Sequence, residues 1–276
     1  DIEADGDLDL VLGAAEGGPQ VLRNNGDGTF SEMQPFSGVE EISAFAWADL
    51  DADGDVDAAI VDRDGALHVF SNERQGQFSK RSVPSGNDRI DALNVMDVDN
   101  DGVFDLLVAQ NDGLIYRLSD KDGTDWVRTD IVKNPHTPEN IYVRGAVDLK
   151  IADLDNNGAL DLVLISAIPV ESSIKCVEGC NVAWLNDGNG KFELLPGSIW
   201  QARVLDVVDL NNDGRLDLLG LVGTFQPAQA INHGSKNYHW QIVRPRATQA
   251  TGDQRINSFG IGGEAEIRSG LLVQKQ

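Results

Sequence analysis

The chain has 276 residues and a formal net charge of −23, because 45 Asp and Glu residues stand against 22 Lys and Arg residues. So acidic a balance argues against nucleic-acid binding, which needs basic side chains to neutralise phosphates, and against docking on anionic membranes. We expect no membrane insertion in this segment, because no apolar run approaches the roughly 20 residues that cross a bilayer, whereas the hydrophobic share of 41% suffices for a folded core.

A nine-residue acidic pattern, D-x-D-x-D-G-x-x-D, recurs five times along the chain. The copies, named loops one to five here, begin at Asp1, Asp49, Asp97, Asp153 and Asp209. They are 48, 48, 56 and 56 residues apart, and glycine stands at the sixth position of each. Self-similarity at a near-constant spacing is the signature of a repeat protein. We therefore expect five copies of one structural unit.

Short apolar runs flank the acidic loops and predict β-strands. The runs that follow the loops are, in chain order, LDLVLGA, VDAAIVD, FDLLVAQ, LDLVLIS and LDLLGLV. Loops two to five also have such a run before them, as in ISAFAWA before Asp49. A third and a fourth run follow after short turns, as in LHVFSN and QFSKRSV, and the same order returns in VLRNNGDGTFSE, AWLNDGNGKFEL and HGSKNYHWQIV. Their length and aliphatic or β-branched content favour strands over helices.

Four strands in about 50 residues, joined by short hairpins, are the unit of a β-propeller blade. We therefore predict an all-β protein, a β-propeller of four-stranded antiparallel blades with five repeats visible. The alternative architecture is a β-solenoid, whose repeats are shorter. The first repeat lacks a strand before its loop, because the chain begins at Asp1.

The acidic loops have the ligand chemistry of calcium sites. Calcium takes about 6–8 oxygen ligands, and positions 1, 3, 5 and 9 can supply side-chain oxygens while position 7 supplies its carbonyl. The glycine at position six permits the sharp bend. The predicted ligands are Asp1, Glu3, Asp5, Asp7 and Asp9; Asp49, Asp51, Asp53, Asp55 and Asp57; Asp97, Asp99, Asp101, Val103 and Asp105; Asp153, Asp155, Asn157, Ala159 and Asp161; and Asp209, Asn211, Asp213, Arg215 and Asp217.

Two other kinds of cation site, the EF-hand and a magnesium site, fit these loops less well. An EF-hand needs a Glu at position 12 between two helices, whereas Leu12, Ile60, Val108, Leu164 and Gly220 stand there and the flanks predict strands. Magnesium prefers to keep several waters. We expect up to five calcium sites, with loops two and three the tightest, because Asn157 and Asn211 each remove a charge from loops four and five.

Cys176 and Cys180 are the only cysteines of the chain. Two thiols and scattered histidines do not make a zinc site. A small disulfide-closed loop suits a secreted protein, and free thiols are the alternative. No metalloprotease, Walker A or nucleophile-elbow motif is present, so we predict that the protein is not an enzyme.

Three tryptophans, Trp126, Trp184 and Trp240, stand near the third or fourth strand of their repeats. We expect them to pack between blades, and the alternative is a platform on which sugar rings stack. Two longer loops, 133–143 and the insertion around Cys176, are the predicted contact regions for a partner.

Sequences such as DLDADGDVDAAIV and LRNNGDGTF resemble the FG-GAP/VCBS repeats of integrin-α-like propellers over residues 1–245. Residues 257–270, NSFGIGGEAEIRSG, are similar to the start of the ASPIC/UnbV domain that follows such repeats in cartilage acidic proteins and secreted bacterial homologues. The resemblance implies two parts, a propeller in 1–245 and a partial ASPIC/UnbV-like β segment in 246–276. It also implies about seven blades in the full protein, of which this chain would be a fragment.

The expected function is that of an extracellular, calcium-stabilised scaffold for adhesion or protein–protein interaction. The resemblance implies a secreted, periplasmic or cell-surface location and a protein or glycan partner. The alternative function is a carbohydrate-binding propeller associated with a polysaccharide-acting enzyme. An alternative to the fragment is a ring of five blades in which a strand within residues 264–272 completes the first blade.

Overall fold

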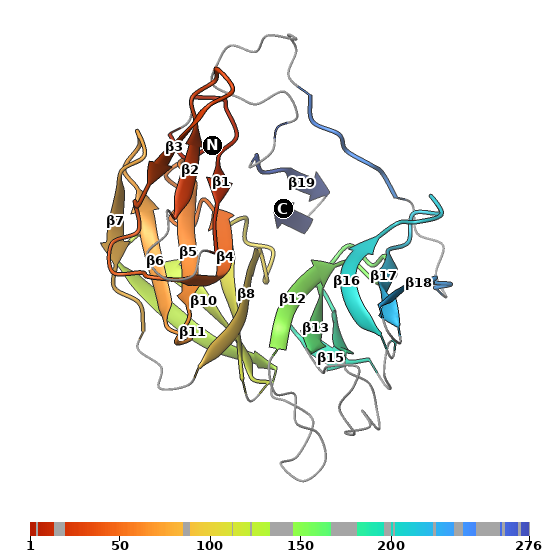
Figure 1. The fold of residues 1–276 in the computed structure, drawn as a ribbon. Coiled ribbons are helices and arrows are strands. Elements are labelled where there is room, and N and C mark those ends of the chain that lie inside the picture. Colours follow the sequence, from red (N-terminus) through yellow and green to blue (C-terminus); the bar gives the residue numbers. More distant parts are fainter. Residues whose placement is uncertain are drawn as a thin grey trace.

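Each acidic loop from loop two onward connects the innermost strand of a small antiparallel sheet to the strand beside it in the computed structural model (Figure 1). Five such sheets are arranged as the blades of a β-propeller, as the repeat predicted. The structure describes residues 1–3, 5–13, 20–84, 89–111, 113–121, 123–132, 146–166, 181–195, 200, 202–222, 225–234, 240–246, 260, 263–269 and 272–275.

The strands follow one another in chain order within each blade. Blade one contains β1 (Leu10–Val11), β2 (Val21–Asn24) and β3 (Phe30–Met33). Blade two contains β4 (Ile42–Ala48), β5 (Asp57–Asp62), β6 (Leu67–Asn72) and β7 (Phe78–Arg81). Blade three contains β8 (Ile90–Met96), β9 (Asp105–Gln110), β10 (Ile115–Lys121) and β11 (Asp125–Val132). Blade four contains β12 (Ala146–Ala152), β13 (Asp161–Ser166), β14 (Asn181–Asn186) and β15 (Phe192–Leu194). Blade five contains β16 (Arg203–Val208), β17 (Asp217–Val222) and β18 (Gln226–Ala230).

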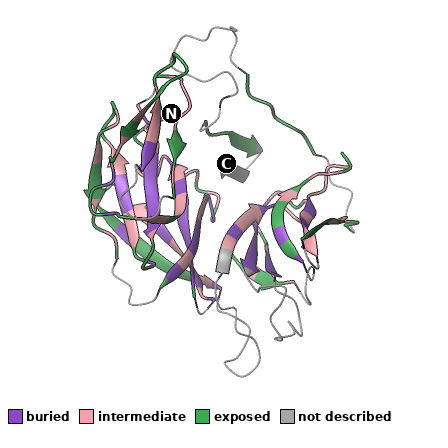
Figure 2. Cartoon of the chain, viewed as in Figure 1, coloured by how far each residue is buried: buried purple, intermediate pink, exposed green. Residues whose placement is uncertain are grey.

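The second strand of each full blade is its most buried element (Figure 2). In β9 every residue is buried, and in β5 all but the last are. A strand that is covered on both faces by neighbouring blades needs apolar side chains on both faces, which explains the near-continuous aliphatic runs after the acidic loops. Because these runs come directly after the acidic loops, each loop of a full blade leads into the most buried strand of its sheet.

The hydrophobic core is divided into four clusters, each shared by two consecutive blades. Phe36 and Phe70 connect blades one and two, with ring centroids 5.4 Å apart. Trp126 and Trp184 are buried in the clusters between blades two and three and between blades three and four, which confirms their predicted packing role. No cluster of described residues connects blade five to blade one.

One expectation and one alternative concerning the terminal blades differ from the structure. The last strands of blade five were expected within residues 233–243; residues 240–243 form no strand, and residues 235–239 lie outside the described part. Trp240 is 47% exposed, with its indole lying against Gly214. The C-terminal strands β19 (Glu266–Ser269) and β20 (Leu272–Lys275) pair with each other and not with β1, so they do not complete blade one. Figure 1 places this hairpin between the blades, near the centre of the propeller.

Several predicted features lie outside the described residues. They are the pair Cys176 and Cys180, the contact loop 133–143, and residues 167–180 of the insertion around Cys176. Within the part of the chain that is described, no helix is long and apolar enough to span a membrane.

Candidate metal centres at the acidic loops

The first-position aspartate folds each loop back on itself. In loop two, Asp49 accepts hydrogen bonds from the backbone N–H groups of Asp53 and Gly54, both at 3.1 Å. The same two hydrogen bonds recur at the first position of the other loops, Asp1, Asp97, Asp153 and Asp209. The fifth-position side chain then accepts from the backbone N–H of position seven in every loop, from Asp5, Asp53, Asp101, Asn157 and Asp213.

Glycine at position six has a positive φ angle in every loop, and the fourth position does too in loops two to five. The sixth-position glycines have φ between 81° and 94°, which explains why glycine stands there in all five copies. The fourth position also lies in the left-handed region, at φ 58° for Ala52, 58° for Asn100, 55° for Asn156 and 60° for Asn212. Asparagine tolerates this conformation better than alanine does.

The ninth-position aspartate connects the loop to the third strand of the blade. Asp57 accepts from the backbone N–H of Leu50 and from that of Asn72, each at 3.0 Å. The equivalent residues Asp9, Asp161 and Asp217 make the same pair of contacts in blades one, four and five. This carboxylate is therefore both a candidate ligand and a structural clamp.

An asparagine at the end of the third strand was missed by the sequence reasoning. It donates its Nδ2–H to the carbonyl of the eighth loop position, as Asn72 does to Val56 at 3.0 Å. The other members of this set are Asn24, Asn186 and Asn232. A signal exists in the sequence, because this asparagine follows the ninth-position aspartate by 15 residues in blades one, two and five.

Side-chain carboxylates converge in three of the five loops. Within each of three groups, one carboxylate oxygen from every residue lies within 4.8 Å of those of the other two. The groups are Asp49, Asp51 and Asp57; Asp97, Asp99 and Asp101; and Asp153, Asp155 and Asp161. Among the described residues of loops one and five no such group forms. The seventh-position residues Asp7, Asp55, Val103, Ala159 and Arg215 were predicted to contribute only their carbonyl oxygens.

Burial makes these carboxylates unfavourable as bare anions. It raises the pKa of Asp57 and of Asp161 to about 7, and that of Asp105 to about 6. The Oδ1 atom of Asp51 and the Oε2 atom of Glu3 are buried without a hydrogen-bond partner. A cation bound among these oxygens would remove both costs, so the donor set fits an oxygen-coordinated metal.

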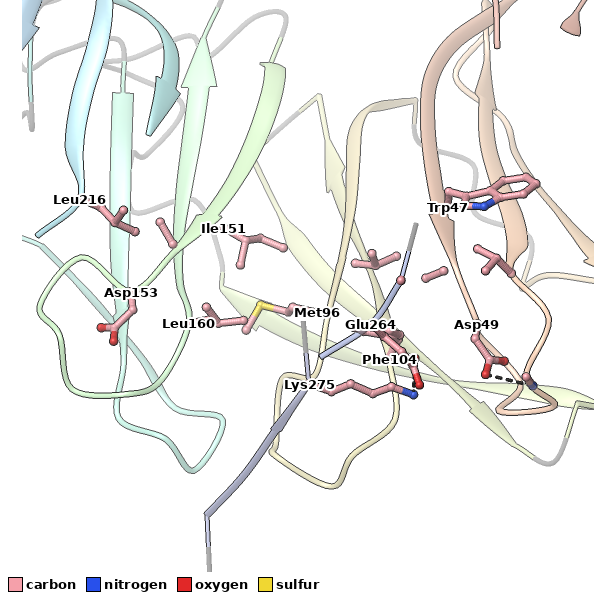
Figure 3. A pocket seen from close by; sticks show the side chains of 16 residues that line it. Trp47, Asp49, Met96, Phe104, Ile151, Asp153, Leu160, Leu216, Glu264 and Lys275 are labelled. Carbon is pink, nitrogen blue, oxygen red and sulfur yellow. Dashed lines mark hydrogen bonds and ion pairs between the residues drawn. The ribbon is translucent and has the colours of Figure 1, made fainter. Parts of the chain in front are cut away.

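A cavity of about 580 Å³ lies beside loops two and four (Figure 3). Its walls are mostly apolar, including Met96 and Phe104, and Asp49 and Asp153 stand at its edge. The buried Lys275 of β20 enters this region, forming an ion pair with Glu264 at 2.7 Å and lying 4.9 Å from the Phe104 ring centroid. These contacts hold the C-terminal hairpin at the centre of the propeller.

The segments that match a known protein family contain the acidic loops. The model of the FG-GAP-like repeat matches residues 1–60, 49–108 and 153–220. Each of these ranges contains two consecutive loops, and together they cover more than half of the chain. No curated protein matches the sequence significantly, and the likeness of residues 257–270 to an ASPIC/UnbV domain stays a prediction. The chain belongs to the family of FG-GAP-like repeat proteins.

Proposed function

We propose that the protein is a calcium-binding β-propeller scaffold in which the ions brace the acidic loops. The observation that carries this proposal is the convergence of three carboxylates within 4.8 Å in loop two, where Asp51 Oδ1 is buried without a hydrogen-bond partner. Carboxylates at such distances repel one another strongly in a buried setting. A divalent cation turns this repulsion into attraction.

The donor atoms favour calcium over other metals. All candidate ligands are carboxylate, amide or carbonyl oxygens, whereas zinc prefers nitrogen and sulfur. Magnesium demands near-ideal octahedral geometry and usually keeps several waters. A loop that supplies up to five oxygens from nine residues suits the larger, more flexible coordination shell of calcium.

The position of the loops indicates a structural role for the ions. Each complete cluster lies at the turn between the innermost strand and the buried second strand of a blade. With a dissociation constant near 0.1 mM and calcium near 1 mM, one site contributes roughly 1.4 kcal/mol to the free energy of unfolding. Two filled sites of this affinity would together contribute about 3 kcal/mol, a large share of a typical domain's stability.

The expected affinity for calcium and the FG-GAP-like repeat family together support an extracellular location and a role in protein interaction. Weak sites of this kind are filled at extracellular calcium concentrations and not at cytosolic ones. A ring of blades braced at its turns presents rigid edges and variable loops to a partner. The partner we propose is therefore an extracellular protein, with a glycan as the alternative.

The glycan alternative depends on exposed aromatic faces. Trp126 and Trp184 are 7% and 4% exposed and belong to the core clusters, so neither offers a ring to a sugar. Of the three tryptophans named for this role, Trp240 alone is exposed. This favours the protein-interaction scaffold.

Calorimetric titration with calcium tests the proposal. We expect the unaltered chain to take up calcium, and Asp51→Asn and Asp155→Asn each to remove one equivalent. Asp130→Asn is the matched control, because Asp130 lies on β11 outside the acidic loops and pairs with Arg128 at 3.3 Å. If the unaltered chain releases or absorbs no heat with calcium and binds no ⁴⁵Ca, the proposal is wrong.

A further inference from the structure

Loop three differs from loops two and four in the carboxylates that converge. In loops two and four the ninth-position residues, Asp57 and Asp161, belong to the group of oxygens within 4.8 Å of one another. In loop three the fifth-position Asp101 belongs to the group instead, and the ninth-position Asp105 does not. A local feature of blade three therefore distinguishes the surroundings of Asp105 from those of Asp57 and Asp161.

That feature is a guanidinium group. Arg117, on β10, places its Nη1 atom 2.6 Å from Asp99 Oδ2 and 3.3 Å from Asp105 Oδ2. Its side chain is only 19% exposed, so solvent screens these ion pairs weakly. Ser119, two residues further along the same strand, hydrogen-bonds the second oxygen of Asp105. The arginine thus bridges the third and ninth positions of the loop.

The strand register shows that blade three alone has an arginine at the position of Arg117. Arg117 pairs with Leu107, two residues after the ninth-position aspartate. The residues at the equivalent register in blades one, two, four and five are Val21, Val69, Ala183 and Gln229. None of these side chains carries a charge, so none can act as a cation toward its own loop.

The arginine that approaches the third-position carboxylate of loop two, Arg81, is engaged elsewhere. Arg81 Nη1 lies 3.9 Å from Asp51 Oδ2, at the outer limit of an ion pair. Its Nη2 atom pairs with Asp120 of blade three, and its guanidinium lies 4.5 Å from the Trp126 ring centroid. Asp51 Oδ1 keeps no hydrogen-bond partner, so Arg81 does not neutralise loop two as Arg117 neutralises loop three.

We propose that the guanidinium of Arg117 neutralises the carboxylates of loop three in place of a metal ion. It thereby keeps calcium out of this loop at concentrations that fill loops two and four. The inference rests on the proposed calcium binding. A calcium ion in loop three would have to displace the guanidinium from Asp99 or lie beside a like charge a few ångströms away. Either event weakens binding by about tenfold or more. This reverses the ranking expected from the number of carboxylates alone.

The variant Arg117→Met tests the role of the guanidinium while keeping an apolar stem. In excess EDTA we expect a lower melting temperature than that of the unaltered chain, because the loop-three carboxylates lose their cation. In calcium we expect one additional equivalent bound, with affinity at least about tenfold above that of loop three in the unaltered chain. The matched control is Arg74→Met, which removes an exposed arginine paired at 2.6 Å with the seventh-position Asp55 of loop two and should add no site.

Single-loop variants keep the inference testable if Arg117→Met does not fold. At 0.1 mM calcium, which half-fills a site with a dissociation constant near 0.1 mM, Asp51→Asn should lower the bound calcium by about half an equivalent, whereas Asp101→Asn should lower it by about a tenth of an equivalent or less. An equal loss in both variants, or an Arg117→Met chain that binds the same number of ions as the unaltered one, overturns the role of Arg117 while calcium binding itself stands. Absence of calcium uptake in the unaltered chain instead removes the proposed function.

Discussion

Asn72 donates its side-chain N–H to the carbonyl oxygen of Val56 at 3.0 Å and so joins the third strand of blade two to the end of its acidic loop. Its side-chain oxygen also accepts from the backbone N–H of Arg74 at 2.9 Å. The same asparagine stands in blades one, four and five. In blade three the equivalent residue is Asp120, whose carboxylate pairs with Arg81 instead. The loops are thus held by protein hydrogen bonds as well as by any ion they bind.

Replacement of Asn72 by alanine removes two of these hydrogen bonds at a partly buried position. We expect Asn72→Ala to lower the free energy of unfolding by about 2 kcal/mol, which corresponds to roughly 4–8 °C in melting temperature. The control is Asn25→Ala, at an exposed turn of blade one, which should change the melting temperature by less than about 2 °C. Equal effects of the two variants, measured by calorimetry, would contradict the role given to Asn72.

Ala52 is the fourth residue of loop two and has a φ of 58°. Alanine is strained in this left-handed conformation, which asparagine occupies in loops three, four and five. We expect Ala52→Asn to raise the free energy of unfolding by about 0.5–1 kcal/mol, and Ala52→Val to lower it because a β-branched side chain fits there worst. Urea denaturation of both variants measures their free energies of unfolding. A valine variant more stable than the asparagine variant would contradict the strain at Ala52.

The pKa values of Asp57 and Asp161, raised by burial to about 7, predict a pH dependence in the absence of metal. The ordinary pKa of an aspartate is 3.8. Between these two values the folded chain holds protons that the unfolded chain releases, so stability falls as pH rises from about 4 to about 7. In EDTA the melting temperature should therefore be higher at pH 5.5 than at pH 8.

Calcium should reverse part of this trend, because the ion replaces the bound protons. The increase in melting temperature caused by calcium should be larger at pH 8 than at pH 5.5. Asp57→Asn is the control, because it removes one of the two groups whose pKa is raised to about 7 and should reduce the pH dependence in EDTA. A melting temperature in EDTA that rises from pH 5.5 to pH 8 would contradict the assignment of the shifted groups.

The sequence predicted the repeated parts of the fold because they are locally encoded. The glycine at position six, the apolar run after each loop and the spacing of Asp49, Asp97 and Asp153 define loops, strands and blades without tertiary information. The hydrogen bonds that fold each loop onto its first-position aspartate were not predicted and come from the structure. The candidate site was predictable to the same extent, since its residues are the pattern itself.

What could not be predicted depends on contacts between strands. The bridge from Arg117 to Asp99 and Asp105 requires the pairing of β10 with β9, which fixes the side of the sheet on which the arginine lies. The placement of Lys275 near Phe104 requires the docking of the C-terminal hairpin. Counting carboxylates therefore ranked the loops without the one positive charge that distinguishes loop three.

The most direct test of the central claim is thermal unfolding of the unaltered chain in 1 mM calcium and in excess EDTA, with 1 mM magnesium as the control. If calcium binds in the carboxylate clusters, the melting temperature should be roughly 5–15 °C higher in calcium than in EDTA. Magnesium should raise it much less. Melting curves that superimpose in calcium and in EDTA would show that the acidic loops are stable without a bound ion and would contradict the account.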